Sequence, residues 1–189
     1  MSEADCWLTF TDTDDCMIEI EVPKDVNVDI SGNAITIKGP LGTNTRMLND
    51  TLLTITKKDG KLVIEQVAKG KLFKKAAMAE VSFVKVLRND MAGVAKHYEI
   101  NMRIVFAHFP INIEIKGAKL NINNMIGERV PRISKIVGTT KIEVKGQAVR
   151  LYGTSLDDVS QTAANIRLAC KIRNKDSRVF QDGLYYEIE

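Results

Sequence analysis

The fold of this chain is decided by the stretch Val26–Gly42, which reads VNVDISGNAITIKGPLG. A related stretch begins 85 residues later as Ile111–Gly127, which reads INIEIKGAKLNINNMIG. Each copy alternates apolar and polar residues, breaks at a glycine and then alternates again, which is typical of a β-hairpin with one buried face. Glycine fits the turn because a positive φ costs it nothing. The recurrence therefore predicts one small fold that is used twice.

In the first copy, we expect the hairpin to be followed by a second hairpin, a helix and a closing strand. Asp-Gly is a strong turn signal between alternating runs, and here it separates Leu52–Thr56 from Lys61–Gln66. Apolar residues spaced by three or four predict a helix from about Leu72 to Met91, which Ala92-Gly93 would stop. The next alternating run, Tyr98–Val105, is expected to close this copy.

The second copy is expected to repeat this order. We predict a strand pair, Ile133–Val137 with Lys141–Val144, and then a further strand, Val149–Tyr152. A helix is expected to begin after Ser155, and a last strand is expected at Leu184–Ile188. Ser155 suits a helix N-cap, because its hydroxyl can accept a bond from a free backbone N–H of the first turn. The predicted fold class is α+β, with two tandem copies of a small antiparallel sheet packed against one helix. The predicted domains are an acidic N-terminal extension (1–22), a first repeat domain (23–106) and a second repeat domain (107–189).

The net charge of +3 hides an uneven distribution of charge. Residues 1–21 carry seven acids and no Lys or Arg, which leaves 27 bases against 17 acids in the rest of the chain. A basic body favours a polyanionic partner such as nucleic acid, and a solvated, lysine-rich surface fits the same charge. The acidic extension would repel phosphates, so we expect it to lie away from the RNA-binding face. It could shield the basic face of the free protein until assembly, or dock onto a neighbouring protein through Trp7, Leu8 and Phe10. Three large apolar residues within four positions favour docking.

Several other classes of protein are disfavoured by the sequence. No apolar run reaches the roughly 18 residues that span a bilayer, and the N-terminus lacks the features of a secretory signal, so we expect a cytoplasmic protein without a membrane partner. The three cysteines have no zinc-binding spacing. The two histidines, His97 and His108, belong to no hydrolase or metalloprotease motif. We therefore expect no enzyme, no small-molecule substrate, no metal and no cofactor.

Basic and aromatic side chains suggest where a nucleic acid could bind. Lysines at the start of the first helix oppose the helix dipole, and an anion held by them and by free N–H groups would explain their position. A solvated face would also accommodate them; they are Lys69, Lys71, Lys74 and Lys75. The stretch Gly39–Gly42 matches the G-x-x-G clamp of an RNA-binding module only weakly, because it follows a strand.

Two loops in the second copy are stronger candidates. The terminal loop combines bases for phosphates with aromatic planes for exposed nucleobases; its residues are Asn174, Lys175, Arg178 and Phe180, with Tyr185 and Tyr186 just beyond. Core packing remains open for Phe180 and for one tyrosine, because adjacent strand residues face opposite ways. The loop Gly127–Arg132 adds Arg129 and Arg132, which we expect to be exposed.

The stretch Arg178–Tyr185, RVFQDGLY, preceded by Asn174-Lys175-Asp176, resembles a signature of the universal large-subunit ribosomal protein six family. The similarity is to the archaeal and eukaryotic branch of that family. Three further stretches agree with it: Ile37–Thr43 (IKGPLGT), Val105–Ile111 (VFAHFPI) and Asn124–Glu128 (NMIGE). The resemblance runs from about Pro23 to Tyr185.

The resemblance implies two tandem sheet-plus-helix domains and a structural, non-catalytic role in translation. Proteins of this family bind large-subunit rRNA, mainly through the second domain, near the sarcin–ricin loop and the stalk base, beside neighbouring ribosomal proteins. It assigns RNA contact to Lys175, Arg178, Asp182, Gly183 and Tyr185, and it makes His108 and the loop Gly127–Arg132 neighbours of RNA. The alternative function is that of a free-standing RNA-binding regulatory protein on the same duplicated fold.

Overall fold

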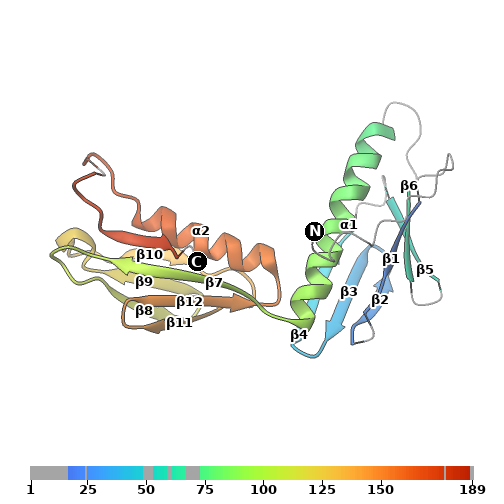
Figure 1. Cartoon of the computed structure of the whole chain (residues 1–189), viewed down its shortest axis with the longest axis horizontal. Helices are drawn as coiled ribbons and strands as arrows, with labels where there is room; N and C mark the ends of the chain where they lie inside the picture. Colours follow the sequence, from blue (N-terminus) through green and yellow to red (C-terminus); the bar gives the residue numbers. More distant parts are fainter. Residues whose placement is uncertain are drawn as a thin grey trace, which may run out of the picture. The chain divides into compact units, whose positions relative to one another are not determined.

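The computed structural model describes residues 17–23, 25–48, 53–58, 61–66, 73–176 and 178–187. The chain divides into two compact units, Met1–Lys96 and His97–Glu189, here called unit 1 and unit 2 (Figure 1). Each unit has its own hydrophobic core. The acidic extension up to Cys16, together with Lys69 and Lys71, lies outside the described residues.

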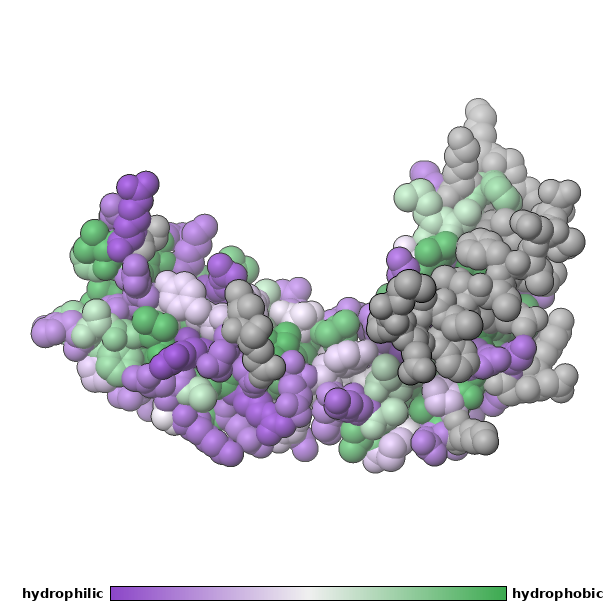
Figure 2. All heavy atoms as spheres, viewed as in Figure 1, coloured by the Kyte–Doolittle hydropathy of each residue, from purple (hydrophilic) through white to green (hydrophobic). Residues whose placement is uncertain are grey.

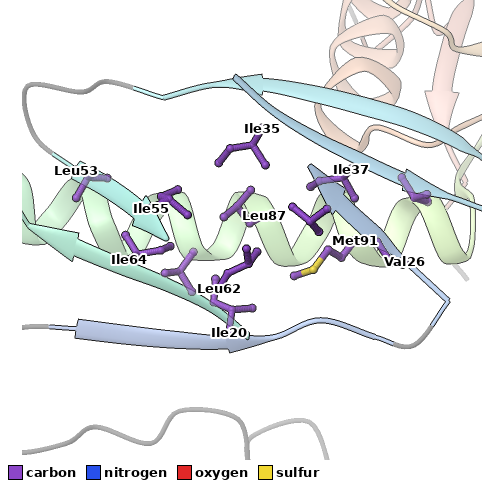
Figure 3. Packing of buried hydrophobic residues seen from close by; sticks show 13 residues of the cluster. Ile20, Val26, Ile35, Ile37, Leu53, Ile55, Leu62, Ile64, Leu87 and Met91 are labelled. Carbon is purple, nitrogen blue, oxygen red and sulfur yellow. The ribbon is translucent and has the colours of Figure 1, made fainter. Parts of the chain in front are cut away.

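The described residues of unit 1 form two three-stranded antiparallel sheets and one helix. One sheet has the order β2 (Asn27–Ser31), β3 (Ala34–Gly39), β4 (Gly42–Met47); the other has the order β1 (Met17–Glu21), β6 (Lys61–Gln66), β5 (Leu53–Lys58). Helix α1 (Phe73–Ala95) packs against both sheets. In β3 alternation buries one side of the strand, so Ile35 and Ile37 enter the core while Lys38 stays outside. Figure 3 shows these side chains meeting Leu87 and Met91 of α1.

Unit 2 has the same plan with one additional strand. A three-stranded sheet has the order β10 (Arg132–Lys135), β9 (Lys119–Asn123), β8 (Asn112–Lys116); a four-stranded sheet has the order β11 (Lys141–Lys145), β12 (Ala148–Gly153), β7 (Tyr98–Val105), β13 (Gly183–Tyr186). A 3₁₀ turn, η2 (Met125–Gly127), comes after β9. Helix α2 (Leu156–Cys170) packs against β7, β10, β12 and β13. The α+β fold class with a duplicated sheet-plus-helix plan is therefore confirmed.

The two repeated hairpins form as predicted. β2 pairs with β3, and β8 pairs with β9, both antiparallel. Their turns begin at Gly32 and Gly117, whose φ angles are +57° and +60°. These angles favour glycine because it has no Cβ to clash with the backbone. Ser155 caps α2 by accepting a hydrogen bond from the Asp158 backbone N–H at 3.3 Å.

The sequence predicts that the alternating run Tyr98–Val105 closes the first copy. In the structure this strand, β7, does not belong to unit 1. It pairs with β12 and β13, two strands of unit 2. In unit 2 it takes the place that β1 takes in unit 1, where β1 pairs with β6. The units accordingly divide after Lys96 and not after residue 106. An alternating pattern shows which side of a strand is buried, but it does not show which sheet the strand joins.

Two smaller expectations are also wrong, and one strand was not predicted. β10 pairs with β9 and not with β11, because the chain returns to the first hairpin before it starts the next one. β4 was not anticipated; its mostly polar residues, GTNTRM, hide the alternation. α1 continues past Gly93 to Ala95, since Gly93 is buried inside the helix and does not end it.

Candidate nucleic-acid interface

Three separate segments of unit 2 are joined by direct contacts. The Ala107 backbone N–H donates to the Asp182 carboxylate at 2.8 Å, which ties the β7–β8 junction to the start of β13. The Asn124 side-chain amide donates to the Pro110 carbonyl at 3.0 Å. The Phe109 ring lies against Gly127, where a Cβ would be 3.4 Å from the ring. These contacts bring together the three family-like stretches of unit 2, which are distant in sequence.

The turn after β9 is held in an unusual backbone conformation. Asn124 and Ile126 have φ angles of +60° and +52°, and Gly127 comes next at +75°. A positive φ is a rare conformation for a β-branched residue such as Ile126. Such angles persist only where the surroundings fix them, and they cluster at functional sites. Here the bond from Asn124 to Pro110 and the contact of Gly127 with Phe109 supply that support.

The terminal loop between α2 and β13 is organised around Asp176. Its carboxylate accepts from the Arg178 backbone N–H at 2.9 Å, and its carbonyl accepts from the Phe180 backbone N–H at 2.9 Å. The Lys175 ammonium lies 4.5 Å from the centre of the Phe180 ring. The Arg178 side chain is exposed and forms no hydrogen bond or ion pair within the described chain. The loop therefore fixes its own backbone while it presents two cations to solvent. Figure 2 shows hydrophilic and hydrophobic residues side by side at this loop, at the upper left.

A hollow of about 570 Å³ lies between α2 and β13. Its lining includes Arg167, Leu168, Phe180 and Tyr186, and the Arg167 guanidinium stacks 5.4 Å from the centre of the Tyr186 ring. Leu168 is 66% exposed. Cys170 also lines the hollow but is itself buried, and burial raises the pKa of its thiol to about 11, so the thiol stays protonated. The hollow can receive a flat ring beside a cation.

The two terminal tyrosines face opposite ways, as strand alternation requires. Tyr185 lies opposite Arg103, and Tyr186 lies opposite the core residue Met102. Both tyrosine rings remain partly exposed. The Tyr185 ring lies over Gly183, which has a φ of +155°. Neither tyrosine is fully absorbed by the core, so both have ring surface available to a ligand.

The sequence predicts an exposed Arg132, but in the structure this side chain is mostly covered. Its side chain is 22% exposed, and its guanidinium donates to the Glu128 carboxylate at 2.8 and 2.5 Å. It also donates to the carbonyls of Ala169 and Lys171, at 3.0 and 3.1 Å. Carbonyls at a helix C-terminus lack partners within the helix, so Arg132 caps α2. The hydrogen bond between the two side chains lowers the pKa of Glu128 and raises that of Arg132.

Asp182 and Gly183 are buried at the start of β13. Asp182 is 7% exposed, and its carboxylate is occupied by the Ala107 backbone N–H. These two residues position the loop and the strand, and direct RNA contact by the Asp182 carboxylate does not fit this burial. The signature Asp-Gly thus acts on the backbone, while its basic and aromatic neighbours face outward.

The remaining candidates of unit 2 are exposed near these contacts. His108 is exposed and stacks edge-on against Phe109, with ring centres 5.0 Å apart. Arg129 and Asn174 are exposed in their loops. Sequence reasoning missed three positioning residues: Phe109, Asn124 and Asp176. All three lie inside or beside the family-like stretches, so those stretches were the available signal, but nothing in them separates a positioning role from a contact role.

The candidates of unit 1 receive less support. Lys69 and Lys71 are outside the described residues, whereas Lys75 is exposed on α1. Gly39–Gly42 is the tight turn between β3 and β4, and a Cβ at Gly39 would lie 2.2 Å from the Val94 side chain. The glycine is therefore required by the close approach of α1, which is a packing role and not an RNA clamp.

Metal-binding and membrane-spanning features are missing from the described part of the chain. No group of three or more His, Cys, Asp or Glu side chains is placed to hold a metal ion there. No helix among those residues has the length and apolar character needed to cross a membrane.

Known proteins resemble this chain over most of its length. The family model "Ribosomal protein L6" matches residues 109–183. The large ribosomal subunit protein uL6 of Methanocella arvoryzae is 42% identical over 88% of this chain and 93% of its own length. The chain belongs to the ribosomal protein L6 family. Proteins named uL6 from Methanosarcina mazei (40% identical) and Sulfurisphaera tokodaii (38%) also match 88% of this chain, and the matches cover 93% and 89% of their lengths.

Membership of the ribosomal protein L6 family settles two points. The family consists of structural, non-enzymatic components of the ribosome, which confirms the expectation that this chain is not an enzyme. The resemblance drawn from the four short stretches is also confirmed. The matched stretch 109–183 contains the turn after β9, all of α2 and the terminal loop.

Proposed function

We propose that this chain is a structural constituent of the large ribosomal subunit that acts in the cytoplasm and binds large-subunit rRNA through unit 2. The observation that carries the proposal is the joining of three family-like segments around exposed basic and aromatic side chains. The relatives are named as large ribosomal subunit proteins, which agrees with this role.

The chemistry of the terminal loop suits RNA. Lys175 and Arg178 supply cations for phosphates, and a guanidinium can contact a phosphate through two parallel hydrogen bonds. Phe180 and the hollow beside Tyr186 supply aromatic planes on which an unstacked base can lie. Because the loop is fixed by its own hydrogen bonds, little ordering is left to oppose binding.

The family implies a more precise location, and we include it in the proposal. Unit 2 binds near the sarcin–ricin loop and the base of the stalk, beside neighbouring ribosomal proteins. A photo-crosslinking amino acid at position 178 in assembled subunits should attach to rRNA of that region. Crosslinks confined to a remote rRNA segment would contradict the location while leaving RNA binding intact.

The test of RNA binding is Arg178→Ala in the full chain. Because the side chain is exposed and forms no hydrogen bond or ion pair within the described chain, the melting temperature should barely change. Affinity for large-subunit rRNA should fall by about 1–3 kcal/mol, which is about 5- to 150-fold.

Arg150→Ala is the matched control, because Arg150 is an exposed arginine of unit 2 that pairs with Glu99. It removes the same charge and should leave affinity nearly unchanged. Equal affinity of Arg178→Ala and the unaltered chain would contradict the assignment.

Sedimentation separates the ribosomal role from that of a free-standing RNA-binding regulator. A structural constituent should migrate with large subunits after a wash at high salt. Recovery of the protein only in the soluble fraction after gentle lysis would favour the regulator.

A further inference from the structure

The outer face of the sheet β8–β9–β10 carries three lysines in one row. Lys116 of β8 lies directly opposite Lys119 of β9, and Lys119 lies directly opposite Lys135 of β10. Residues that face each other across antiparallel strands share one side of the sheet. The other side carries Leu120 and Ser134, which are buried, so the three lysines point to solvent, and all three are exposed. We call this set the lysine row.

The lysine row is not explained by the stability of the sheet. Like charges directly opposite each other destabilise an antiparallel pair, and this sheet has two such pairs in succession. Lys116 is relieved by Glu114, whose carboxylate lies 3.1 Å from its ammonium. Neither Lys119 nor Lys135 forms an ion pair with any described residue. Two uncompensated cations therefore remain side by side on a flat surface.

The surroundings of the lysine row favour a phosphate backbone as its ligand. The same face carries Asn112, Asn121 and Asn123, whose amides can donate to phosphate or sugar oxygens. Protein–protein interfaces are instead depleted in lysine and enriched in aromatic residues and arginine. The one large apolar side chain in the middle of this face is Ile133, and no aromatic residue accompanies it among the described strands.

The lysine row is separate from the interface described above. It lies beside the turn at Gly117, whereas Asn112 and Asn123, four residues along the same strands, adjoin Pro110 and the turn after β9. Four residues of strand span about 13 Å. We propose that the lysine row is a second RNA-contact surface of unit 2, which binds rRNA phosphates beyond those held by the terminal loop. This inference rests on the proposed function.

The test compares the salt dependence of rRNA binding by the full chain and its variants. Each phosphate contact that is lost lowers the slope of log affinity against log salt by about 0.7–0.9. The variant Lys116→Gln/Lys119→Gln/Lys135→Gln should therefore bind more weakly at low salt, with a slope reduced by about 2. Its melting temperature should stay equal or rise, because the repulsion between the lysines is gone.

Lys85→Gln/Lys141→Gln/Lys145→Gln is the matched control. It removes three exposed lysines from other surfaces and should leave the slope nearly unchanged. Lys116→Arg/Lys119→Arg/Lys135→Arg keeps the charge of the row and should keep the slope, which separates charge from any loss of folding.

The possible failures are distinguishable. If the glutamine variant keeps the slope while Arg178→Ala still weakens binding, the lysine row does not contact rRNA. The proposed function then still stands. An unchanged affinity in both overturns the proposed function as well. If the glutamine variant binds rRNA normally but is lost from washed subunits, the proposal of an RNA ligand is wrong. The lysine row would then bind an acidic protein.

Discussion

Asp90 is a buried charge on the core side of α1. The residue is 1% exposed, and its carboxylate accepts hydrogen bonds from the Arg46 guanidinium at 2.6 and 3.1 Å. The Asn44 amide donates to the same carboxylate at 3.3 Å. These contacts link α1 to β4, the strand whose polar composition hid it from the sequence analysis. Asn44 and Arg46 of β4 are thus the partners that the buried carboxylate needs.

Asp90→Ala should destabilise unit 1 by about 1–3 kcal/mol, because the buried carboxylate that accepts hydrogen bonds from the Arg46 guanidinium and the Asn44 amide is lost. Denaturant unfolding of the full chain, followed by a probe in unit 1, measures the change. Asp29→Ala is the control, since Asp29 pairs with Lys38 on the exposed face of β2 and β3. It should change the midpoint little, and comparable losses in both variants would contradict a special role for burial.

Position 39 requires glycine because the Val94 side chain of α1 lies close to it, and not because its φ is positive. A Cβ there would lie 2.2 Å from the Val94 side chain of α1. Gly39→Ala should therefore cost about 1–3 kcal/mol of unit 1 stability, as overpacked sites do. Adding Val94→Ala should recover part of that loss, although each single change destabilises the protein. If the double variant loses as much stability as the two single variants lose together, the clash with Val94 is not the cause.

Arg132 joins two elements of unit 2. It stands at the start of β10 and caps the last carbonyls of α2, while Glu128 in the preceding loop holds its guanidinium. Through this residue the end of the helix and the loop beside the turn after β9 are placed together. Its part in the interface is thus to position the loop, and Arg129 is left as the exposed arginine of that loop.

Arg132→Ala should destabilise unit 2 by about 1–3 kcal/mol, because helix carbonyls and a carboxylate lose their donor. Arg132→Lys should restore only part of this, since an ammonium lacks the fork of donors that reaches both partners. The folded-state pKa of Glu128 is lowered, so its contribution is complete above its unfolded pKa and is lost as pH falls through the folded pKa. The difference between Arg132→Ala and the unaltered chain should be larger at pH 7 than at about pH 3 in urea unfolding.

The two units differ in the path of the chain after the helix. After α1 the chain leaves unit 1 and becomes β7, whereas after α2 it returns to unit 2 as β13. β13 pairs only with β7 among the described strands, so the terminal signature depends on a strand that precedes the second hairpin. The candidate interface is therefore complete only when β7 is present.

Two fragments test this dependence. The fragment 97–189 contains β7 and should unfold cooperatively and bind rRNA with the salt dependence of unit 2. The fragment 107–189 starts at the boundary expected from the sequence and lacks the strand between β12 and β13. It should give no cooperative transition, because β13 loses the strand it pairs with, β12 keeps only β11, and the core loses Met102 and Ile104. Cooperative folding of the shorter fragment would restore the boundary at residue 106.

Much of the fold is determined by the order of residues along the chain. The repeated hairpins, the cap at Ser155 and the apolar stripe of α2 were all predictable, because each is set by contacts within a few residues. The short stretches around Phe109, Ile126 and Arg178 also identified the family, because such a match depends only on the order of residues along the chain.

What the sequence could not show is how distant segments combine. The alternation of Tyr98–Val105 is satisfied equally by either sheet, and the charge of Arg132 or Asp182 fits a ligand as well as a helix end or a backbone N–H. Those choices depend on which groups become buried together, because a buried polar group must find its partner inside the protein while an exposed one has water. Only the packed molecule brings Ala107 to Asp182 and Arg132 to the end of α2, and so leaves Lys175 and Arg178 facing outward.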